Sequence, residues 1–199
     1  MAGWLMLPAM VEEPDDRTLM LGYRDGDVAA FEVLYTRHKG PLYRYFLRRG
    51  MRQERASELF QEVWTKIIGA KDRYQPTAKF TTYMYRLAHN CYVDEIRRQG
   101  RTPVTADGLG RIDPDEIPGD SRDDPRSHVE QLESVNQFRR ALSDLPADQR
   151  EAFILREEGG LSLADIASVT GVNSETAKSR LRYAVRKLRQ ALLETEEST

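Results

Sequence analysis

Residues 161–189 read LSLADIASVTGVNSETAKSRLRYAVRKLR, and the residues that begin and end helices within this stretch decide the fold of this part of the chain. Ser162 and Asp165 have the spacing of a capping box, which opens a short helix. Gly171 ends that helix, and Asn173 or the following serine can cap the next one, which leaves a turn of about three or four residues. This spacing predicts a helix-turn-helix, whose second helix enters a DNA major groove.

The second of these helices separates its side chains into two faces when it is plotted at 100° per residue. A buried stripe is expected from Ala177, Leu181, Ala184, Val185, Leu188 and Leu192. A basic ridge is expected from Lys178, Arg182, Arg186 and Arg189, with Glu175 inside it and Ser179 at its edge. A charged helix face usually meets only solvent, but the helix-turn-helix spacing favours DNA binding. Side chains in the first two turns of the second helix can reach the edges of nucleobases, and the basic residues further along suit phosphates.

The length and composition limit the classes of protein to which the chain can belong. A chain of 199 residues with 31% charged and 40% hydrophobic residues and a net charge of −2 can bury one large core or two small ones. No apolar run approaches a membrane span, and MAGWLMLPAM lacks the basic start of a signal peptide, so we expect a disordered tail there. Cys91 is the single cysteine, which excludes an internal disulfide and fits a reducing cytoplasm.

No catalytic or metal chemistry is apparent in the sequence. Cys91 and the three histidines, His38, His89 and His128, have no recognisable zinc spacing. There is no glycine-rich phosphate loop, and no nucleophile can be paired with a base. We therefore expect no enzyme, no metal and no cofactor.

A linker divides the chain into two blocks. Residues 103–127 contain four prolines, three glycines and seven acids against three bases, without apolar periodicity. The apolar period of both blocks is helical. We expect an all-α protein of two small helical domains, 15–102 and 128–195, joined by a flexible acidic linker and flanked by tails at 1–14 and 196–199.

The first block contains a regular amphipathic helix within residues 53–70. Its core stripe consists of Ala56, Leu59, Phe60, Val63, Trp64 and Ile67. Its polar remainder consists of Glu58, Gln61, Glu62 and Thr65. Those acids and amides are either a solvated back face or a docking surface for a basic partner.

The next helix, within residues 79–101, has an apolar inner arc formed by Met84, Leu87, Ala88 and Cys91. Another face gathers Tyr83, Arg86, Asn90 and Arg97. This combination suits single-stranded nucleic acid, because unpaired bases can stack on the ring while arginines hold the backbone. Aromatic residues on helices more often belong to the core, and that alternative stays open for Tyr83.

Taken in order, these stretches resemble the sigma-70 family of bacterial transcription initiation factors, in particular its extracytoplasmic-function (ECF) group. AFEVLYTRHKGPLYRYFLRR (30–49) is similar to the first conserved region of domain 2, and ASELFQEVWTKI (56–67) to the helix that binds the polymerase clamp. KFTTYMYRLAHNCYVDEIRR (79–98) is similar to the minus-10 reading helix, and residues 141–189 are similar to domain 4.

The resemblance implies a non-catalytic cytoplasmic sigma factor that binds the clamp and flap of core RNA polymerase and the promoter DNA, without membrane insertion. An anti-sigma factor is an expected partner. The implied polymerase contacts are Glu58, Gln61, Glu62 and Thr65. The implied minus-10 contacts are Arg73, Lys79, Tyr83, Arg86, Asn90, Arg97 and Arg98. The implied minus-35 contacts are Glu175, Thr176, Lys178, Ser179, Arg182, Tyr183, Arg186 and Arg189.

Three positions depart from the family pattern. Glu58 stands where Asp is common, Tyr83 where Trp is common, and the Gly40–Pro41 pair interrupts the first conserved helix and is expected to kink it. The rival interpretation is an autonomous helix-turn-helix regulator with an N-terminal sensing or dimerisation domain. That class shares the C-terminal motif but leaves ASELFQEVW and the helix with Tyr83 and Asn90 unexplained.

Overall fold

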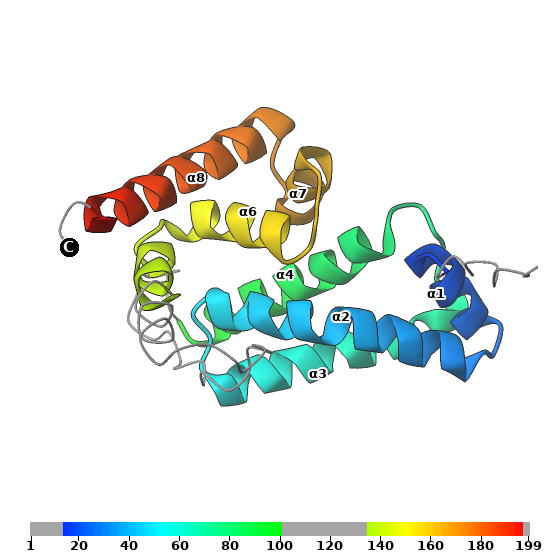
Figure 1. Ribbon diagram of the computed structural model, residues 1–199. Coiled ribbons are helices and arrows are strands. Elements are labelled where there is room, and N and C mark those ends of the chain that lie inside the picture. The colour runs from blue at the N-terminus through cyan, green and yellow to red at the C-terminus, as the bar shows by residue number, and fades with distance from the viewer. Residues whose placement is uncertain (1–13, 101–134, 197–199) are drawn as a thin grey trace, which may run out of the picture.

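The computed structural model describes residues 14–100 and 135–196, and these ranges consist of helices joined by short turns, without a strand (Figure 1). The linker at 103–127 and nearly all of both predicted tails lie outside the described residues. None of the helices in the two ranges is long and apolar enough to cross a membrane. The elements are α1 (Asp16–Arg24), α2 (Val28–Arg48), α3 (Gln53–Gly69), the 3-10 turn η1 (Lys71–Arg73), α4 (Phe80–Arg98), a helix at 135–143, α6 (Ala147–Glu157), α7 (Leu163–Thr170) and α8 (Ser174–Glu196). The all-α prediction is confirmed.

In the first block, α2, α3 and α4 pack side by side, with α1 against the N-terminal end of α2. Asp15 caps α1 by accepting from the Thr18 N–H at 2.7 Å, and Asp27 caps α2 in the same way. Leu34, Leu59 and Met84 are fully buried between the three long helices. These helices form the layer from which the exposed faces of α3 and α4 project.

Helix α2 continues through Gly40 and Pro41, so the interruption expected from this pair does not end the helix. Proline removes one backbone donor and costs roughly 3 kcal/mol inside a helix. Leu42, Tyr45 and Phe46 follow directly and are completely buried. Burying each large apolar side chain contributes about 1.5–3 kcal/mol, which offsets the proline.

The second block contains the predicted helix-turn-helix. Ser162 and Asp165 form a reciprocal capping box at α7, and Gly171 ends that helix in the left-handed conformation, with φ 68°. Asn173 then accepts from the Thr176 N–H at 2.7 Å at the start of α8. The capping box and both ends of the turn are confirmed.

The buried stripe predicted for α8 is confirmed only in part. Ala177, Ala184 and Leu188 are buried, the last two against the helix at 135–143. Val185, which the helical period predicts for the stripe, is 38% exposed. It lies at the edge of the apolar arc, where the side of the helix already turns toward solvent.

The two blocks pack against each other. In Figure 1, α7 lies beside the N-terminal half of α4, and α6 lies over α2 and α4, while α8 forms the outer edge. Most buried apolar side chains of the two blocks merge into one cluster that runs from Leu19 to Ala177, whereas Leu142, Leu145, Ala184 and Leu188 form a second, smaller cluster. The Tyr45 and Tyr85 rings, 5.4 Å apart, lie at this junction. Two helical domains are present as expected, and their contact is a feature that the sequence did not indicate.

Candidate nucleic-acid and protein-binding surfaces

The basic ridge of α8 is open to solvent. Lys178, Arg182, Arg186 and Arg189 are all exposed, as is Glu175, whose carboxylate lies 3.8 Å from the Lys178 ammonium. Thr176 and Ser179 are half-buried beside them. Every side chain predicted for the ridge is therefore accessible to a ligand on one face of α8.

Tyr183 joins this ridge through its ring. The tyrosine is 38% exposed, and the guanidinium groups of Arg182 and Arg186 lie 5.3 and 5.0 Å from its ring centroid. At these distances a cation and an aromatic ring attract each other. The Tyr183 ring thus stabilises the positions of two arginines of the ridge. Helical periodicity alone does not predict this contact.

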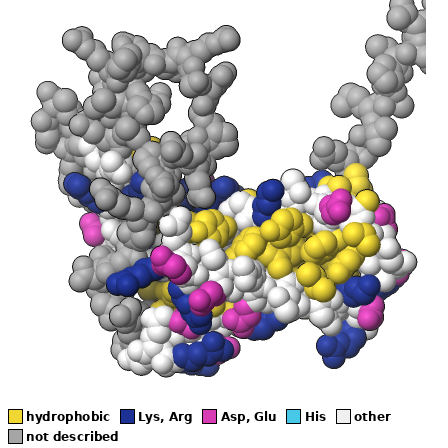
Figure 2. Space-filling view, turned by 90° about the horizontal axis from the view of Figure 1, so that it is seen from below, with side chains coloured by type: hydrophobic (Ala, Val, Ile, Leu, Met, Phe, Trp, Pro, Cys, Tyr) yellow, Lys and Arg dark blue, Asp and Glu magenta, His cyan; other side chains and the backbone are white. Residues whose placement is uncertain are grey.

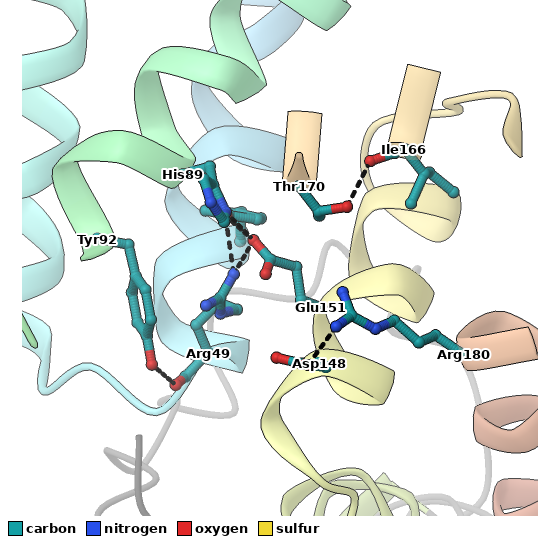
Figure 3. Close-up of polar contacts among 9 residues, drawn as sticks. Arg49, His89, Tyr92, Asp148, Glu151, Ile166, Thr170 and Arg180 are labelled. Atoms are coloured by element: carbon teal, nitrogen blue, oxygen red, sulfur yellow. Dashed lines mark hydrogen bonds and ion pairs between the residues drawn. The ribbon is translucent and has the colours of Figure 1, made fainter. Parts of the chain in front are cut away.

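Arg180 is a base of α8 that does not belong to the ridge. Its guanidinium forms an ion pair with Asp148 of α6 (Figure 3), which ties α8 to the helix behind it. The positive charge of α8 is therefore divided between an exposed ridge and an ion pair with α6 at the protein surface.

The outer face of α4 presents a second group of predicted residues. Asn90, Arg97 and Arg98 are exposed, and Tyr83 is half-buried. The Tyr83 ring lies 5.6 Å from the ring of Tyr74, and burial raises the pKa of its hydroxyl. Tyr83 thus packs against Tyr74 and still has part of its side chain exposed to solvent.

The predicted α4 residues do not form a single compact site. Arg73 and Lys79, before the helix, and Arg86 are exposed near its N-terminal end, where the half-buried Tyr83 also lies. A helix of this length spans about 28 Å, so Arg97 lies about three to five turns away from these groups. The arrangement suits an extended ligand that follows the helix.

The polar face of α3 is the third candidate surface. Glu58, Gln61 and Thr65 are exposed, and Glu62 is half-buried. Glu58 pairs with Arg55, and Glu62 accepts from the Lys66 ammonium at 2.8 Å. The hydrogen bond from Lys66 lowers the pKa of Glu62. The face therefore carries ionised carboxylates whose charge is partly balanced one turn away.

Apolar side chains gather beside this polar face, as the view from the α3 side in Figure 2 shows. Tyr35 and Phe60 have ring centroids 6.1 Å apart and are half-buried, while Val33 and Ile68 are 45% and 44% exposed. The sequence pattern assigned Phe60 to the core stripe and so missed its exposed edge.

A polar cluster, absent from the sequence predictions, lies where the two blocks meet (Figure 3). The Glu151 carboxylate of α6 pairs with the Arg49 guanidinium and accepts from the Tyr45 hydroxyl at 2.8 Å; it also lies 2.7 Å from Nδ1 of His89. The Arg49 and Glu151 side chains are each only 5% exposed. Burial alone would raise the pKa of Glu151, but Arg49, His89 and Tyr45 together lower it to about 2.

Glu158 forms a second polar link between the blocks. Its carboxylate lies 2.9 Å from the Arg44 guanidinium and 2.6 Å from that of Arg48, both on α2. The Glu158 side chain is only 6% exposed.

Across the two described ranges, no group of three or more acidic, histidine or cysteine side chains could hold a metal ion.

Two family models match this chain. The model described as sigma-70 region 2 matches residues 34–102, which include most of α2 together with α3 and α4. The model described as sigma-70, region 4 matches residues 136–188, which include the helix-turn-helix.

Whole-length relatives are similar to both blocks together. The RNA polymerase sigma factor CarQ of Myxococcus xanthus is 31% identical over 176 residues, which cover 87% of this chain and 95% of the relative. The ECF RNA polymerase sigma-E factor of Escherichia coli K12 is 28% identical over 86% of this chain and 91% of its own length.

Solved structures share the fold. CnrH, in complex with the cytosolic domain of CnrY, aligns with a TM-score of 0.62 at 22% identity and covers 90% of this chain and 97% of its own. The sigma factor RpoE of Bartonella quintana, in complex with the anti-sigma factor NepR, aligns with a TM-score of 0.62 at 21% identity over 83% of this chain and 98% of its own.

Proposed function

This chain belongs to the ECF group of the sigma-70 family of RNA polymerase sigma factors, and from that membership we propose a role for each of its exposed surfaces. It binds core RNA polymerase and directs promoter-specific transcription initiation in bacteria. Sigma factors are initiation factors, so we assign this chain binding roles and no catalytic step. We place it in the cytoplasm, where the polymerase works.

The basic ridge of α8 reads the minus-35 duplex. The observation that carries the whole proposal is that this ridge is exposed on the second helix of a fully capped helix-turn-helix. Lys178 and Ser179 lie in the first two turns, where a helix entering the major groove meets base edges. Arg186 and Arg189 lie two to three turns further on, where phosphates predominate. Domain 4, residues 128–195, thus carries the duplex-reading function.

The outer face of α4 holds unpaired bases of the minus-10 element. Tyr83 offers a half-exposed ring for stacking, and Asn90 offers an amide one to two turns further on. The exposed arginines Arg73, Arg97 and Arg98 extend this face at both ends, where they can contact the phosphates of the DNA strand. Domain 2, residues 15–102, thus carries both this surface and the one on α3.

The polar face of α3 docks on the polymerase clamp, and domain 4 contacts the flap. Support for the clamp assignment comes from Glu58, Gln61 and Thr65, which project away from the core, and from the neighbouring apolar side chains on the same side of the molecule. A mixed polar and apolar surface of this kind is typical of protein interfaces.

Charge reversal separates docking from folding. Glu58→Lys with Glu62→Lys is expected to keep the helical content and to abolish co-purification with core polymerase, because both carboxylates lie outside the core. The matched control reverses the same number of charges at Glu32 and Glu157, which are exposed on α2 and α6. Loss of helicity in the first variant, or undiminished association with polymerase, would refute this assignment.

We also expect an anti-sigma factor among the partners of this chain. The neighbours CnrH and RpoE were solved with the cytosolic domain of CnrY and the anti-sigma factor NepR, respectively. Co-purification of the tagged chain from its own bacterium, with core polymerase removed, would test this expectation. Recovery of the chain with no stoichiometric partner under every growth condition would count against it.

A further inference from the structure

We propose that Glu175 is a specificity-determining residue of the α8 ridge, and that together with Lys178 it selects one C·G base pair of the minus-35 element. This inference rests on the proposed function, because a base can be selected only if the ridge enters the duplex. Its evidence is the position, the exposure and the charge of Glu175 within an otherwise basic ridge.

Glu175 is the single acid among residues 174–193 of α8, a stretch that contains six basic residues. At 100° per residue its direction lies between those of Lys178 and Ser179, which follow one turn further along the helix. The carboxylate therefore projects from the middle of the ridge, where it faces whatever the ridge binds.

The capped start of α8 fixes the backbone that carries this side chain. Asn173 accepts from the Thr176 N–H at 2.7 Å and so holds the first turn, which includes Glu175. The Glu175 side chain is 83% exposed. The first turns of a helix in the major groove are those that meet base edges, so the carboxylate is placed to contact a base.

The Glu175 carboxylate forms a loose ion pair with the Lys178 ammonium. Oε1 and Nζ lie 3.8 Å apart, and the Lys178 side chain is 60% exposed. An exposed ion pair of this kind contributes little to stability, so either group can exchange its partner for a group on DNA at little cost. The pair therefore presents a hydrogen-bond acceptor and a donor next to each other.

A carboxylate in the major groove is repelled by most of the groups that it meets. The phosphates are anionic, and the hydrogen-bonding groups that guanine and thymine expose there are acceptors: N7 and O6 of guanine, and O4 of thymine. The donors are the N4 amino group of cytosine and the N6 amino group of adenine. Glu175 thus rejects many sequences, and rejection of wrong partners is one source of specificity.

Cytosine suits the carboxylate better than adenine does. In adenine the acceptor N7 lies beside N6, so its lone pair would face one of the carboxylate oxygens. In cytosine the N4 amino group lies beside a C–H group, which does not repel the carboxylate. The O6 atom of the paired guanine lies about 2.7–3.2 Å from N4, so Lys178 can donate to guanine while Glu175 accepts from cytosine. The ion pair is therefore complementary to one C·G pair.

The test is the base preference of the holoenzyme, formed from the full-length chain and core polymerase, on duplexes with a randomised minus-35 element. The wild type is expected to prefer a C·G pair about tenfold at one position. Glu175→Ala should remove the preference at that position and keep it elsewhere in the element. Glu175→Gln should change the preferred base from cytosine to adenine, because an amide pairs with both N6 and N7 of adenine.

Lys178 is expected to act on the same base pair. Lys178→Ala should reduce the preference at the position that Glu175→Ala affects. The double variant should lose no more there than Glu175→Ala alone, because the two groups address one base pair. Effects of the two single variants at different positions would overturn the assignment of both side chains to one pair.

Binding of the holoenzyme to duplexes that lack the element gives a second readout. Glu175→Ala removes a group that phosphates repel, so it is expected to bind these duplexes about two- to fivefold more tightly than the wild type. Loss of α8 structure would instead weaken binding to every duplex. Weaker binding of Glu175→Ala to all sequences would therefore show a structural role and overturn the inference.

A matched control moves the acid instead of removing it. An acid in the first turn also stabilises a helix through its dipole. Ser174 is exposed in the same turn and points about 100° away from Glu175. Ser174→Glu with Glu175→Ala keeps the net charge and the dipole interaction, and it is expected to lose the cytosine preference as Glu175→Ala does. A preference retained in this double variant would overturn the inference.

The remaining results separate this inference from the proposed function. A wild-type holoenzyme with a minus-35 preference that no substitution of Glu175 alters would overturn the inference and leave the proposed function intact. An A·T pair at the position that Glu175→Ala affects would also overturn it. A wild-type chain that gives core polymerase no promoter preference would overturn the proposed function itself.

Discussion

Replacing Glu151 with glutamine is expected to destabilise the folded chain by about 3 kcal/mol at pH 7. The side chain is buried and pairs with Arg49, which is equally buried. Its pKa falls from 4.5 to about 2 on folding, and at 1.36 kcal/mol for each pH unit this corresponds to about 3 kcal/mol. The glutamine keeps the shape but leaves the Arg49 guanidinium without a countercharge.

The pH dependence follows from the same depressed pKa. The contribution of Glu151 is fully present above about pH 4.5 and is lost as the pH falls toward 2, because the unfolded chain takes up the proton first. The difference in stability between wild type and Glu151→Gln should therefore be constant from pH 7 to about 5. It should shrink steadily below about 4.5.

Urea unfolding followed by far-ultraviolet circular dichroism, repeated from pH 7 to pH 3, measures this difference. The matched control is Glu157→Gln, an exposed carboxylate on the same helix, which is expected to change stability by less than about 0.5 kcal/mol. An effect of Glu151→Gln no larger than that of the control, or a difference that persists undiminished at pH 3, would refute the reasoning.

Three further predictions concern the binding surfaces. Asn90→Ala should lower transcription from duplex promoters and recover on a template with a pre-opened bubble, whereas equal losses on both templates would exclude a role in strand capture. Lys178→Ala should change which minus-35 sequences are preferred in a randomised library, and an unchanged preference would place the reading end of α8 elsewhere. Arg189→Ala should weaken all promoters about equally and reduce the salt slope of binding by about one, which a salt titration of holoenzyme binding measures.

Local signals were sufficient for the helix-turn-helix. The capping box at Ser162 and the positive φ of Gly171 depend on residues that are close in sequence, so their types predict the structure directly. The exposed polar face of α3 was predictable for the same reason, since a helical period fixes which side chains point away from the core. The periodicity does not tell whether that face meets only solvent or binds a partner; the proposed docking role follows from the resemblance.

The contact between the domains could not be predicted in this way. Glu151 lies 106 positions from Tyr45, and a helical period gives no information on which distant residue a charged side chain will meet. Glutamate on a helix is normally exposed, so nothing in the sequence indicates that Glu151 and Glu158 are buried. The same limit applies to Pro41, whose effect on α2 depends on the burial of the residues that follow it.

The most direct test of the central claim is run-off transcription with purified core RNA polymerase on fragments of genomic DNA from the source bacterium, with and without this chain. We expect discrete transcripts that appear only when the chain is present and whose upstream regions share a minus-35 and a minus-10 element. The account would be contradicted by the absence of any chain-dependent transcript together with nanomolar binding of the free chain, as a dimer, to a palindromic site.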